Sequence, residues 1–177
     1  MILPFSIVTG NSQFGEDRRL LEIFNGSESG VCVEVGAFDG VTGSTTRAFE
    51  LLGWTTILVE PVPELAQQIR RQRSGRVFEV AAGPSDSTVV LRRAILDPAI
   101  STVADTRWQN QLYALRSESW EEIRVRQLSL DRILEEAGVS RLDFATIDVE
   151  GYELEVLRGL FDRHPLFIRH ECEPPAE

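Results

Sequence analysis

Acidic side chains stand at the ends of several short apolar runs in this chain of 177 residues. Glu60 ends the run 55–60, and Asp148 and Glu150 lie at the end of the run 142–149. Carboxylates that lie close together repel one another unless a cation, a proton or a hydroxylated ligand is present. Ligands of an open parallel sheet bind outside the carboxyl ends of its strands. If these runs are strands of one sheet, the acids indicate a binding site at that edge.

The other expected strand ends add polar residues to the same edge. Taken together, the strand ends carry Gly36 with Asp39, Glu60, Ala82, Asp148 with Glu150, and His170 with Glu171. A second interpretation stays open for part of this set. Glu150 and Glu153 also fall in the first turn of an expected helix, where the helix dipole favours acids. A histidine at a strand end, such as His170, is also often a packing residue.

A loop with two glycines follows the first of these strands. Residues 31–35 form a nearly continuous apolar run with β-branched residues at every second position, which is typical of a strand buried on both faces. Gly36 and Gly40 follow, and glycine allows a tight turn and the close approach of a ligand. The pattern Glu-x-Gly-x-x-x-Gly lacks the third glycine of the dinucleotide fingerprint and the Gly-Lys-Ser/Thr of a phosphate loop. An ordinary strand-to-helix turn therefore explains the loop equally well.

The position of Glu60 gives the loop a more specific interpretation. It lies about twenty residues after the loop, which is the spacing of an acid that binds a ribose. One carboxylate can accept hydrogen bonds from both hydroxyl groups of the sugar. An exposed glutamate at a strand end is the alternative, and the spacing favours the ribose role.

Hydrophobic periodicity predicts that strands and helices alternate along the chain. The expected strands are residues 31–35, 55–60, 77–82, 142–149 and 166–170, with strand-like segments at 88–95 and 123–128. The expected helices are residues 16–24, 45–52, 63–74, 130–137 and 154–161. This alternation predicts an α/β fold with a mostly parallel sheet and right-handed crossovers. Residues 1–177 are expected to form a single domain, with an N-terminal extension and helix at 1–30 and an irregular loop or lid at 96–120.

Composition and charge limit the class of protein. The hydrophobic fraction of 42% and the charged fraction of 26% are those of a soluble globular protein. The net charge of −10 argues against a nucleic-acid partner, because no basic surplus is left to neutralise phosphates. Arg70, Arg71, Arg73 and Arg76 are a local exception, which we interpret as a solvated helix end.

The cysteines and the apolar segments give expectations about the cellular compartment. Cys32 and Cys172 lie far apart in apolar runs, so we expect free buried thiols in a reducing compartment. Residues 1–8 are apolar but few, and no basic residue precedes them, so they do not resemble a signal peptide. No later stretch is long enough to span a membrane. The expectation is a cytoplasmic protein without a membrane partner.

Several motifs, in a fixed order along the chain, resemble a known family. They are Ser-Gln-Phe-Gly-Glu-Asp at 12–17, Val-Glu-Val-Gly-Ala-Phe-Asp-Gly at 33–40, Gly-Trp at 53–54, Leu-Val-Glu-Pro at 58–61, Ala-Ala-Gly at 81–83, Leu-Ser-Leu-Asp at 128–131 and Ile-Asp-Val-Glu-Gly-Tyr-Glu at 147–153. Together they resemble the FkbM family of S-adenosylmethionine-dependent methyltransferases, from about residue 12 to residue 171.

This resemblance implies a Rossmann-like class I methyltransferase fold, with helices on both faces of the sheet. It also implies methyl transfer from S-adenosylmethionine to a hydroxyl oxygen of a small acceptor, since members of the family act on sugars and natural products such as polyketides. The cofactor residues that it implies are Glu34, Gly36, Ala37 and Asp39 at the methionine end, Ser44 and Thr45 near its carboxylate, Glu60 and Pro61 at the ribose, Ala81 and Ala82 at the adenine, and Asp148 facing the reacting centre.

A hydroxyl nucleophile needs a base within hydrogen-bond reach to remove its proton. The candidate catalytic residues are Asp148, Glu150 and His170. Asp148 comes first, because in the usual strand order it ends the strand nearest the glycine loop. A rim of acids also suits the positive charge of the sulfonium.

The C-terminus departs from the family pattern and leaves alternatives open. Only seven residues follow His170, whereas class I sheets normally finish with an antiparallel strand pair. The segments 88–95 and 123–128 can substitute for that pair, or a partner chain can cover the open edge, as in a homodimer. Two other functions also stay open. One is a metal-assisted transfer with Mg²⁺ on Asp148, Glu150 and Glu171, and the other is a non-catalytic module that binds a nucleotide-like ligand or a partner.

Overall fold

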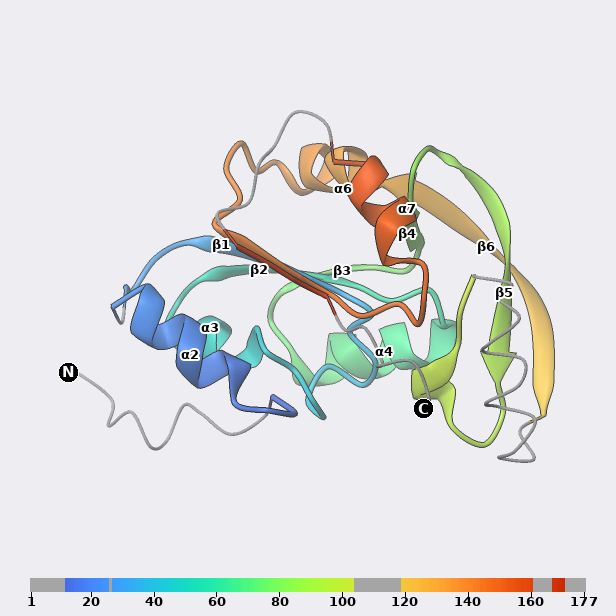
Figure 1. The fold of residues 1–177 in the computed structure, drawn as a ribbon, viewed down its shortest axis with the longest axis horizontal. Helices are drawn as coiled ribbons and strands as arrows, with labels where there is room; N and C mark the ends of the chain where they lie inside the picture. Colours follow the sequence, from blue (N-terminus) through green and yellow to red (C-terminus); the bar gives the residue numbers. More distant parts are fainter. Residues whose placement is uncertain (1–11, 26, 104–118, 161–166, 171–177) are drawn as a thin grey trace, which may run out of the picture.

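Five parallel strands form one sheet (Figure 1). Apart from Ala81 and Ala82, the predicted site residues lie on these strands or on the loops that follow them. The computed structural model describes residues 12–25, 27–103, 119–160 and 167–170, the last four for their backbone only. Across the sheet the strands follow the order β3 (Arg76–Phe78), β2 (Thr55–Val59), β1 (Val31–Val35), β7 (Phe144–Ile147) and β8 (Phe167–His170). The predicted α/β class and Rossmann-like sheet are therefore confirmed.

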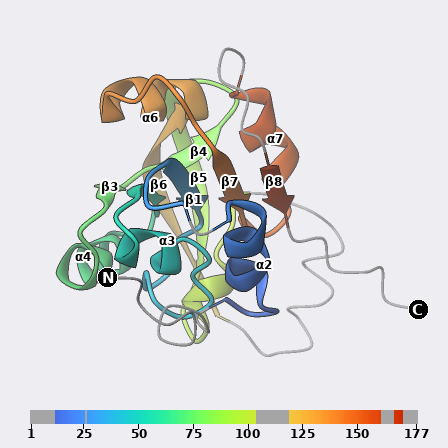
Figure 2. The same cartoon turned by 90° about the vertical axis from the view of Figure 1, so that its left-hand side faces the viewer.

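Helices cover both faces of this sheet (Figures 1 and 2). On one face lie α2 (Glu16–Ile23), α3 (Arg47–Leu51) and α4 (Pro63–Gln72), and on the other lie α6 (Leu130–Ala137) and α7 (Glu153–Arg158). Side chains of a strand alternate between the two faces. Val33 of β1 accordingly packs in the core that includes Val156 of α7, and Cys32 packs against Phe49 of α3. Cys32 is a buried free thiol, as predicted.

The ends of α6 follow the signals in the sequence. The Ser129 hydroxyl accepts a hydrogen bond from the Arg132 amide at 3.2 Å, which caps the first turn. Gly138 ends the helix in the left-handed conformation at φ 73°, which glycine adopts without steric cost. The helix therefore covers residues 130–137, as the sequence predicted.

A second sheet of three strands stands beside the first, in the order β4 (Ala81–Gly83), β6 (Trp120–Ser129) and β5 (Ser87–Ala94) (Figure 2). The prediction of one strand over residues 77–82 is wrong, because the segment is divided between β3 in the first sheet and β4 in the second. All of its residues except the exposed Glu79 are apolar, because the segment contributes to more than one core. Val80 joins the core beneath α6, whereas Ala81 packs with Leu91 of β5.

The segments 88–95 and 123–128 do form an antiparallel pair, within β5 and β6. This pair belongs to the second sheet and does not extend the five-stranded sheet. A short 3-10 helix, η1 (Pro98–Ile100), follows β5. Most of the predicted loop or lid at 96–120 falls on residues 104–118, outside the described residues, so a lid stays a prediction.

Candidate active site

A cavity of about 510 Å³ opens at the carboxyl ends of the parallel strands. Most of the predicted site residues line it: Glu34, Gly36, Ala37, Thr45, Glu60, Pro61, Ala81, Ala82, Asp148 and Glu150. Asp39 and Ser44 lie close by but do not form part of its wall. His170 is the last residue of β8 and its side chain is outside the described part of the chain, as is all of Glu171. The structure thus brings ten of the predicted residues to one space.

The glycine loop after β1 lies directly against the end of β7. The amides of Gly36 and Ala37 donate to the Val59 carbonyl of β2 at 3.0 and 3.1 Å, which turns the loop across the sheet edge. The Asp148 amide donates to the Val35 carbonyl at 2.9 Å. The expected neighbourhood of Asp148 and the glycine loop is therefore confirmed.

Gly36 is the residue at which these two loops touch, and Gly36→Ala should strongly destabilise the chain. Its φ is 82°, and a methyl group there would lie 1.8 Å from the Asp148 carbonyl oxygen. Gly43→Ala is the matched control, because Gly43 has φ 72° but no atom within 4 Å of the added methyl. The control should lose only the left-handed strain, about 1–2 kcal/mol, and Gly36→Ala should lose more. Urea unfolding measures both, and equal losses would contradict the close contact.

Glu60 at the end of β2 is buried in the cavity wall, with 5% of its surface exposed. Its Oε2 accepts the Phe38 amide at 3.0 Å and its Oε1 accepts the Val62 amide at 2.9 Å. Burial raises the pKa of this carboxyl to about 8, although the two backbone hydrogen bonds oppose the rise. Glu60 thus holds the loop at Phe38, and hydrogen bonds donated by a ligand would favour its ionised form.

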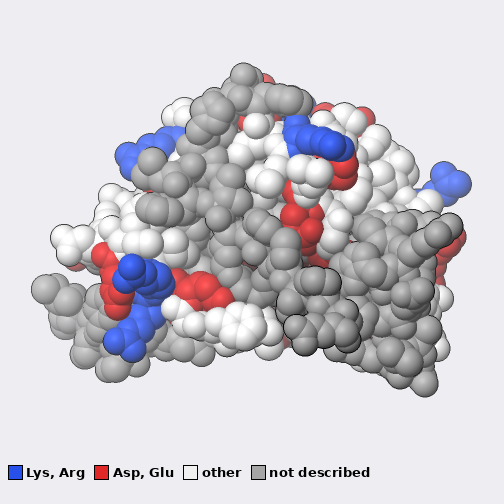
Figure 3. All heavy atoms as spheres, in the orientation of Figure 1, with Lys and Arg blue, Asp and Glu red and all other residues white. Residues whose placement is uncertain are grey.

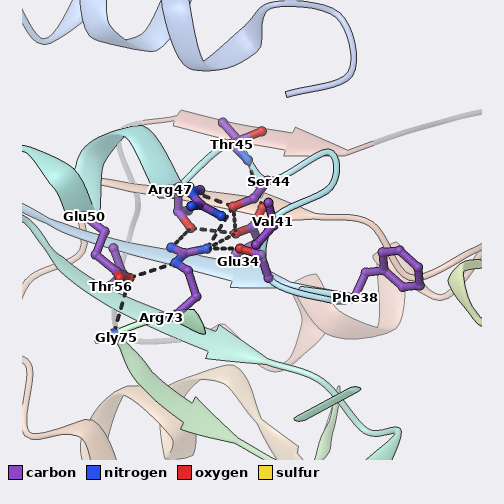
Figure 4. Close-up of polar contacts among 12 residues, drawn as sticks. Glu34, Phe38, Val41, Ser44, Thr45, Arg47, Glu50, Thr56, Arg73 and Gly75 are labelled. Atoms are coloured by element: carbon purple, nitrogen blue, oxygen red, sulfur yellow. Dashed lines mark hydrogen bonds and ion pairs between the residues drawn. The ribbon is translucent and has the colours of Figure 1, made fainter. Parts of the chain in front are cut away.

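Glu34 of β1 lies beneath the loop that leads into α3 (Figure 4). Its Oε2 accepts the Ser44 and Thr46 hydroxyls at 2.8 and 2.6 Å, and its Oε1 accepts the Thr45 amide at 2.9 Å. These bonds fix the chain between Gly43 and α3. Thr46 was not singled out in the sequence, where it reads as one more polar residue of the loop.

The prediction that all four arginines at 70–76 are solvated is wrong for Arg73, which is only 7% exposed (Figure 4). Its guanidinium donates to Glu50 Oε2 at 3.0 Å and to the Gly40 carbonyl at 2.7 Å, and it lies 3.8 Å from Glu34 Oε2. Arg73 is buried because two acids, Glu34 of β1 and Glu50 of α3, face the end of α4. Arg70, Arg71 and Arg76 are exposed, as predicted.

The loop after β7 is held in a tight conformation. Glu150 and Gly151 both have positive φ, at 55° and 93°. Glu153 Oε1 accepts the amides of Val149 and Gly151 at 3.3 and 2.9 Å, so this acid caps the loop. The Thr102 hydroxyl, which follows η1, donates to the Glu150 carbonyl at 2.9 Å and fastens the loop from the other side. Thr102 comes from an irregular segment, and no sequence signal indicated its role.

Asp39 serves the turn of the glycine loop. Its Oδ1 accepts the Val41 and Thr42 amides, each at 2.7 Å, and its Oδ2 accepts the Thr42 hydroxyl at 2.7 Å. Partial burial acts to raise the pKa of Asp39, but these hydrogen bonds outweigh it and lower the pKa below its usual value. A contact between Asp39 and the methionine end of a cofactor stays a prediction.

The family model for the methyltransferase FkbM domain matches residues 34–174. The chain belongs to the FkbM methyltransferase family. The match begins within β1 and spans β2, β7 and β8, and it includes every residue that lines the cavity at the strand ends except Gln13. Searches among curated proteins and among solved structures gave no match. Membership implies that S-adenosylmethionine is the methyl donor of this FkbM domain.

Three further observations concern the partners of the FkbM domain. No group of three or more His, Cys, Asp or Glu side chains in the described part of the chain is placed to hold a metal ion, so the Mg²⁺ alternative has no support there. Within the same residues, no helix combines the length and apolar character needed to cross a membrane. On the face in Figure 3, the described arginine side chains lie in separate groups and form no continuous basic surface.

Proposed function

We propose that this FkbM domain transfers a methyl group from S-adenosylmethionine to a hydroxyl oxygen of a small molecule such as a sugar or a natural product. The observation that carries the proposal is the shared cavity, which joins the glycine loop, Glu60 and the acids Asp148 and Glu150 in one space. Class I methyltransferase chemistry needs a cofactor site and a base beside it, and this cavity offers residues of both kinds.

The residues of the cavity suit the parts of the cofactor. Glu60 has carboxylate oxygens that can accept the ribose hydroxyls, and Ala81 and Ala82 give an apolar wall for the adenine. Gly36 lines the cavity, and its missing side chain makes room for the Asp148 carbonyl, which brings the glycine loop and the end of β7 together at the sheet edge. Glu34 and Thr45 also line the cavity, and their polar groups suit the amino-acid end of the cofactor.

The chemistry is an in-line displacement, in which the enzyme aligns oxygen, carbon and sulfur. S-adenosylmethionine supplies a methyl group on a positively charged sulfur and leaves as the neutral thioether. Asp148, which lines the cavity beside the glycine loop, accepts the proton of the acceptor hydroxyl as the new carbon–oxygen bond forms. Glu150 contributes negative charge near the sulfonium. His170 remains a candidate base from the sequence alone.

The test is transfer of radiolabelled methyl from S-adenosylmethionine to a panel of sugars and hydroxylated natural products. Asp148→Asn should lower the transfer rate at least 100-fold, which is the lower range for a general base, while cofactor binding stays within about tenfold. Asp97→Asn, an exposed aspartate outside the cavity wall, is the control and should keep full activity. Full activity of Asp148→Asn would contradict its role, and loss of activity in chelator would restore the metal alternative.

A further inference from the structure

Thr146 lies in the wall of the cavity and was not singled out by the sequence. It belongs to β7 and stands in register with Glu34 of β1, so the two side chains project from the same face of the sheet. Thr146 is 3% exposed and lines the cavity. Its Oγ1 has no hydrogen-bond partner among the described residues. Thr146 thus places a hydroxyl without a described partner next to Glu34 of the adjacent strand, at the sheet edge where ligands bind.

An unpaired buried hydroxyl lowers stability, because it loses its hydrogen bonds to water and gains none in the protein. Valine has nearly the same shape and would fill a β-strand position without that cost. Positions at which a sequence departs from the most stable choice are commonly functional sites. The cost is offset where a ligand that enters the cavity supplies the missing partner. A rotation about χ1 exchanges the hydroxyl and the methyl of threonine, so the hydroxyl can turn toward a ligand.

The neighbouring carboxylate has acceptor capacity on the same side. Glu34 Oε2 accepts two hydroxyls, but Oε1 accepts only the Thr45 amide within the described part of the chain. A carboxylate oxygen accepts two hydrogen bonds, so one remains available on Oε1. An acceptor on Glu34 beside a hydroxyl on Thr146 suits a group that donates several N–H bonds.

The charge of the cluster favours a cation. Arg73 forms ion pairs with both Glu34 and Glu50, at 3.8 and 3.0 Å. With all three ionised, one positive and two negative charges leave this buried group at −1. A bound cation at Glu34 would neutralise the excess in a site where water screens it poorly.

We infer that Thr146 binds the α-ammonium group of the amino-acid end of S-adenosylmethionine, beside Glu34, which the family resemblance already assigns to that end. The inference rests on the proposed function and adds Thr146 as a cofactor-binding residue. The ammonium donates one hydrogen bond to Glu34 Oε1 and one to Thr146 Oγ1. Its positive charge balances the cluster that Arg73 leaves negative.

The experiment compares Thr146→Val with Thr146→Ser by calorimetric titration of three ligands. These are S-adenosylmethionine, its decarboxylated form, which keeps the amine, and 5′-methylthioadenosine, which lacks the whole amino-acid end. Thr146→Val should bind the first two about tenfold more weakly and the third unchanged. Thr146→Ser keeps the hydroxyl and should bind all three like the native chain. Urea unfolding without ligand should show Thr146→Val to be at least as stable as the native chain, since it loses an unpaired polar group.

Several results would overturn this inference. An unchanged affinity of Thr146→Val for S-adenosylmethionine would do so, as would an equal loss for 5′-methylthioadenosine. If Thr146→Val loses affinity for S-adenosylmethionine but not for its decarboxylated form, Thr146 contacts the carboxylate instead of the ammonium. A large loss of stability in Thr146→Val would show that the role of Thr146 is structural. If the native chain binds S-adenosylmethionine and Thr146→Val binds it equally well, only this inference is overturned. A native chain that binds none of the ligands overturns the proposed function as well.

Discussion

Glu60→Gln is expected to weaken the binding of S-adenosylmethionine about 100-fold. In its ionised form the native side chain accepts the amides of Phe38 and Val62. No other donor to it is found in the described part of the chain, so its remaining lone pairs can accept the two ribose hydroxyls. Hydrogen bonds to a charged group are worth about 1.5–3 kcal/mol each. Glutamine keeps the size of the side chain but has one acceptor oxygen and no charge, so it cannot satisfy the backbone amides and the ribose together.

Calorimetric titration measures this loss, with Glu79→Gln as the matched control. Glu79 follows β3, lies outside the cavity wall, and has an exposed side chain. The control should bind S-adenosylmethionine within about twofold of the native chain, because exposed charges contribute little. The ligand 5′-methylthioadenosine shares the ribose and should lose the same factor with Glu60→Gln. An affinity of Glu60→Gln equal to that of the native chain would remove Glu60 from the ribose site.

The raised pKa of Glu60 adds a pH dependence to the same variant. Its pKa is about 8 in the free protein, and the ribose hydroxyls donate to the ionised form. Below pH 8 binding must therefore release a proton, which costs about 1.4 kcal/mol for each pH unit. Affinity should rise up to about tenfold per unit between pH 6 and pH 8 and level off above. Glu60→Gln has no such proton, and a native chain whose affinity is equally flat would contradict this account.

Arg73→Met is expected to lower the free energy of unfolding by about 3–5 kcal/mol, the cost of removing one partner from a buried ion pair. The substitution leaves Glu50 and Glu34 buried without their cation and removes the bond to the Gly40 carbonyl. Because that bond joins α4 to the glycine loop, S-adenosylmethionine binding should weaken too. Methionine keeps the length of the apolar stem, so the loss reports the charge.

The matched control for this variant is Arg70→Met on the same helix. Arg70 pairs with Glu79 at 2.8 Å on the surface, where both side chains are about half exposed. Such exposed pairs are worth about 0–1 kcal/mol. Urea unfolding of the two variants should therefore differ by at least about 2 kcal/mol. Similar losses for Arg73→Met and Arg70→Met would show that the buried network contributes no more than a surface pair.

The sequence predicted the parts of the fold in which local pattern and tertiary position agree. The strands β1, β2 and β7 are buried on both faces and read as apolar runs, and Ser129 and Gly138 mark the ends of α6. The position of Glu60 in the cavity was predictable because its spacing from the glycine loop is set by one strand–helix–strand unit. The cavity joins residues from separate strands, and the expected parallel order placed them at one edge.

The remaining features depend on contacts that the sequence does not display. Residues 77–82 are apolar except for Glu79 and suit one long strand as well as two short ones, so the sequence does not indicate the break between β3 and β4. Arg73 resembles its exposed neighbours until Glu34 and Glu50 are placed against it. Thr146 is an ordinary strand residue by propensity, and only its register with Glu34 gives it a role. Tertiary placement, rather than residue type, decides these three cases.

The roles proposed for Glu60, Thr146 and Asp148 all require that S-adenosylmethionine binds in the cavity at the strand ends. The most direct test is calorimetric titration of the native chain with S-adenosylmethionine and, separately, with NAD. We predict that one S-adenosylmethionine binds per chain with an affinity on the micromolar scale and that NAD gives no binding heat, because the loop lacks the third glycine of the dinucleotide fingerprint. No binding of S-adenosylmethionine, or equally tight binding of NAD, would contradict the claim.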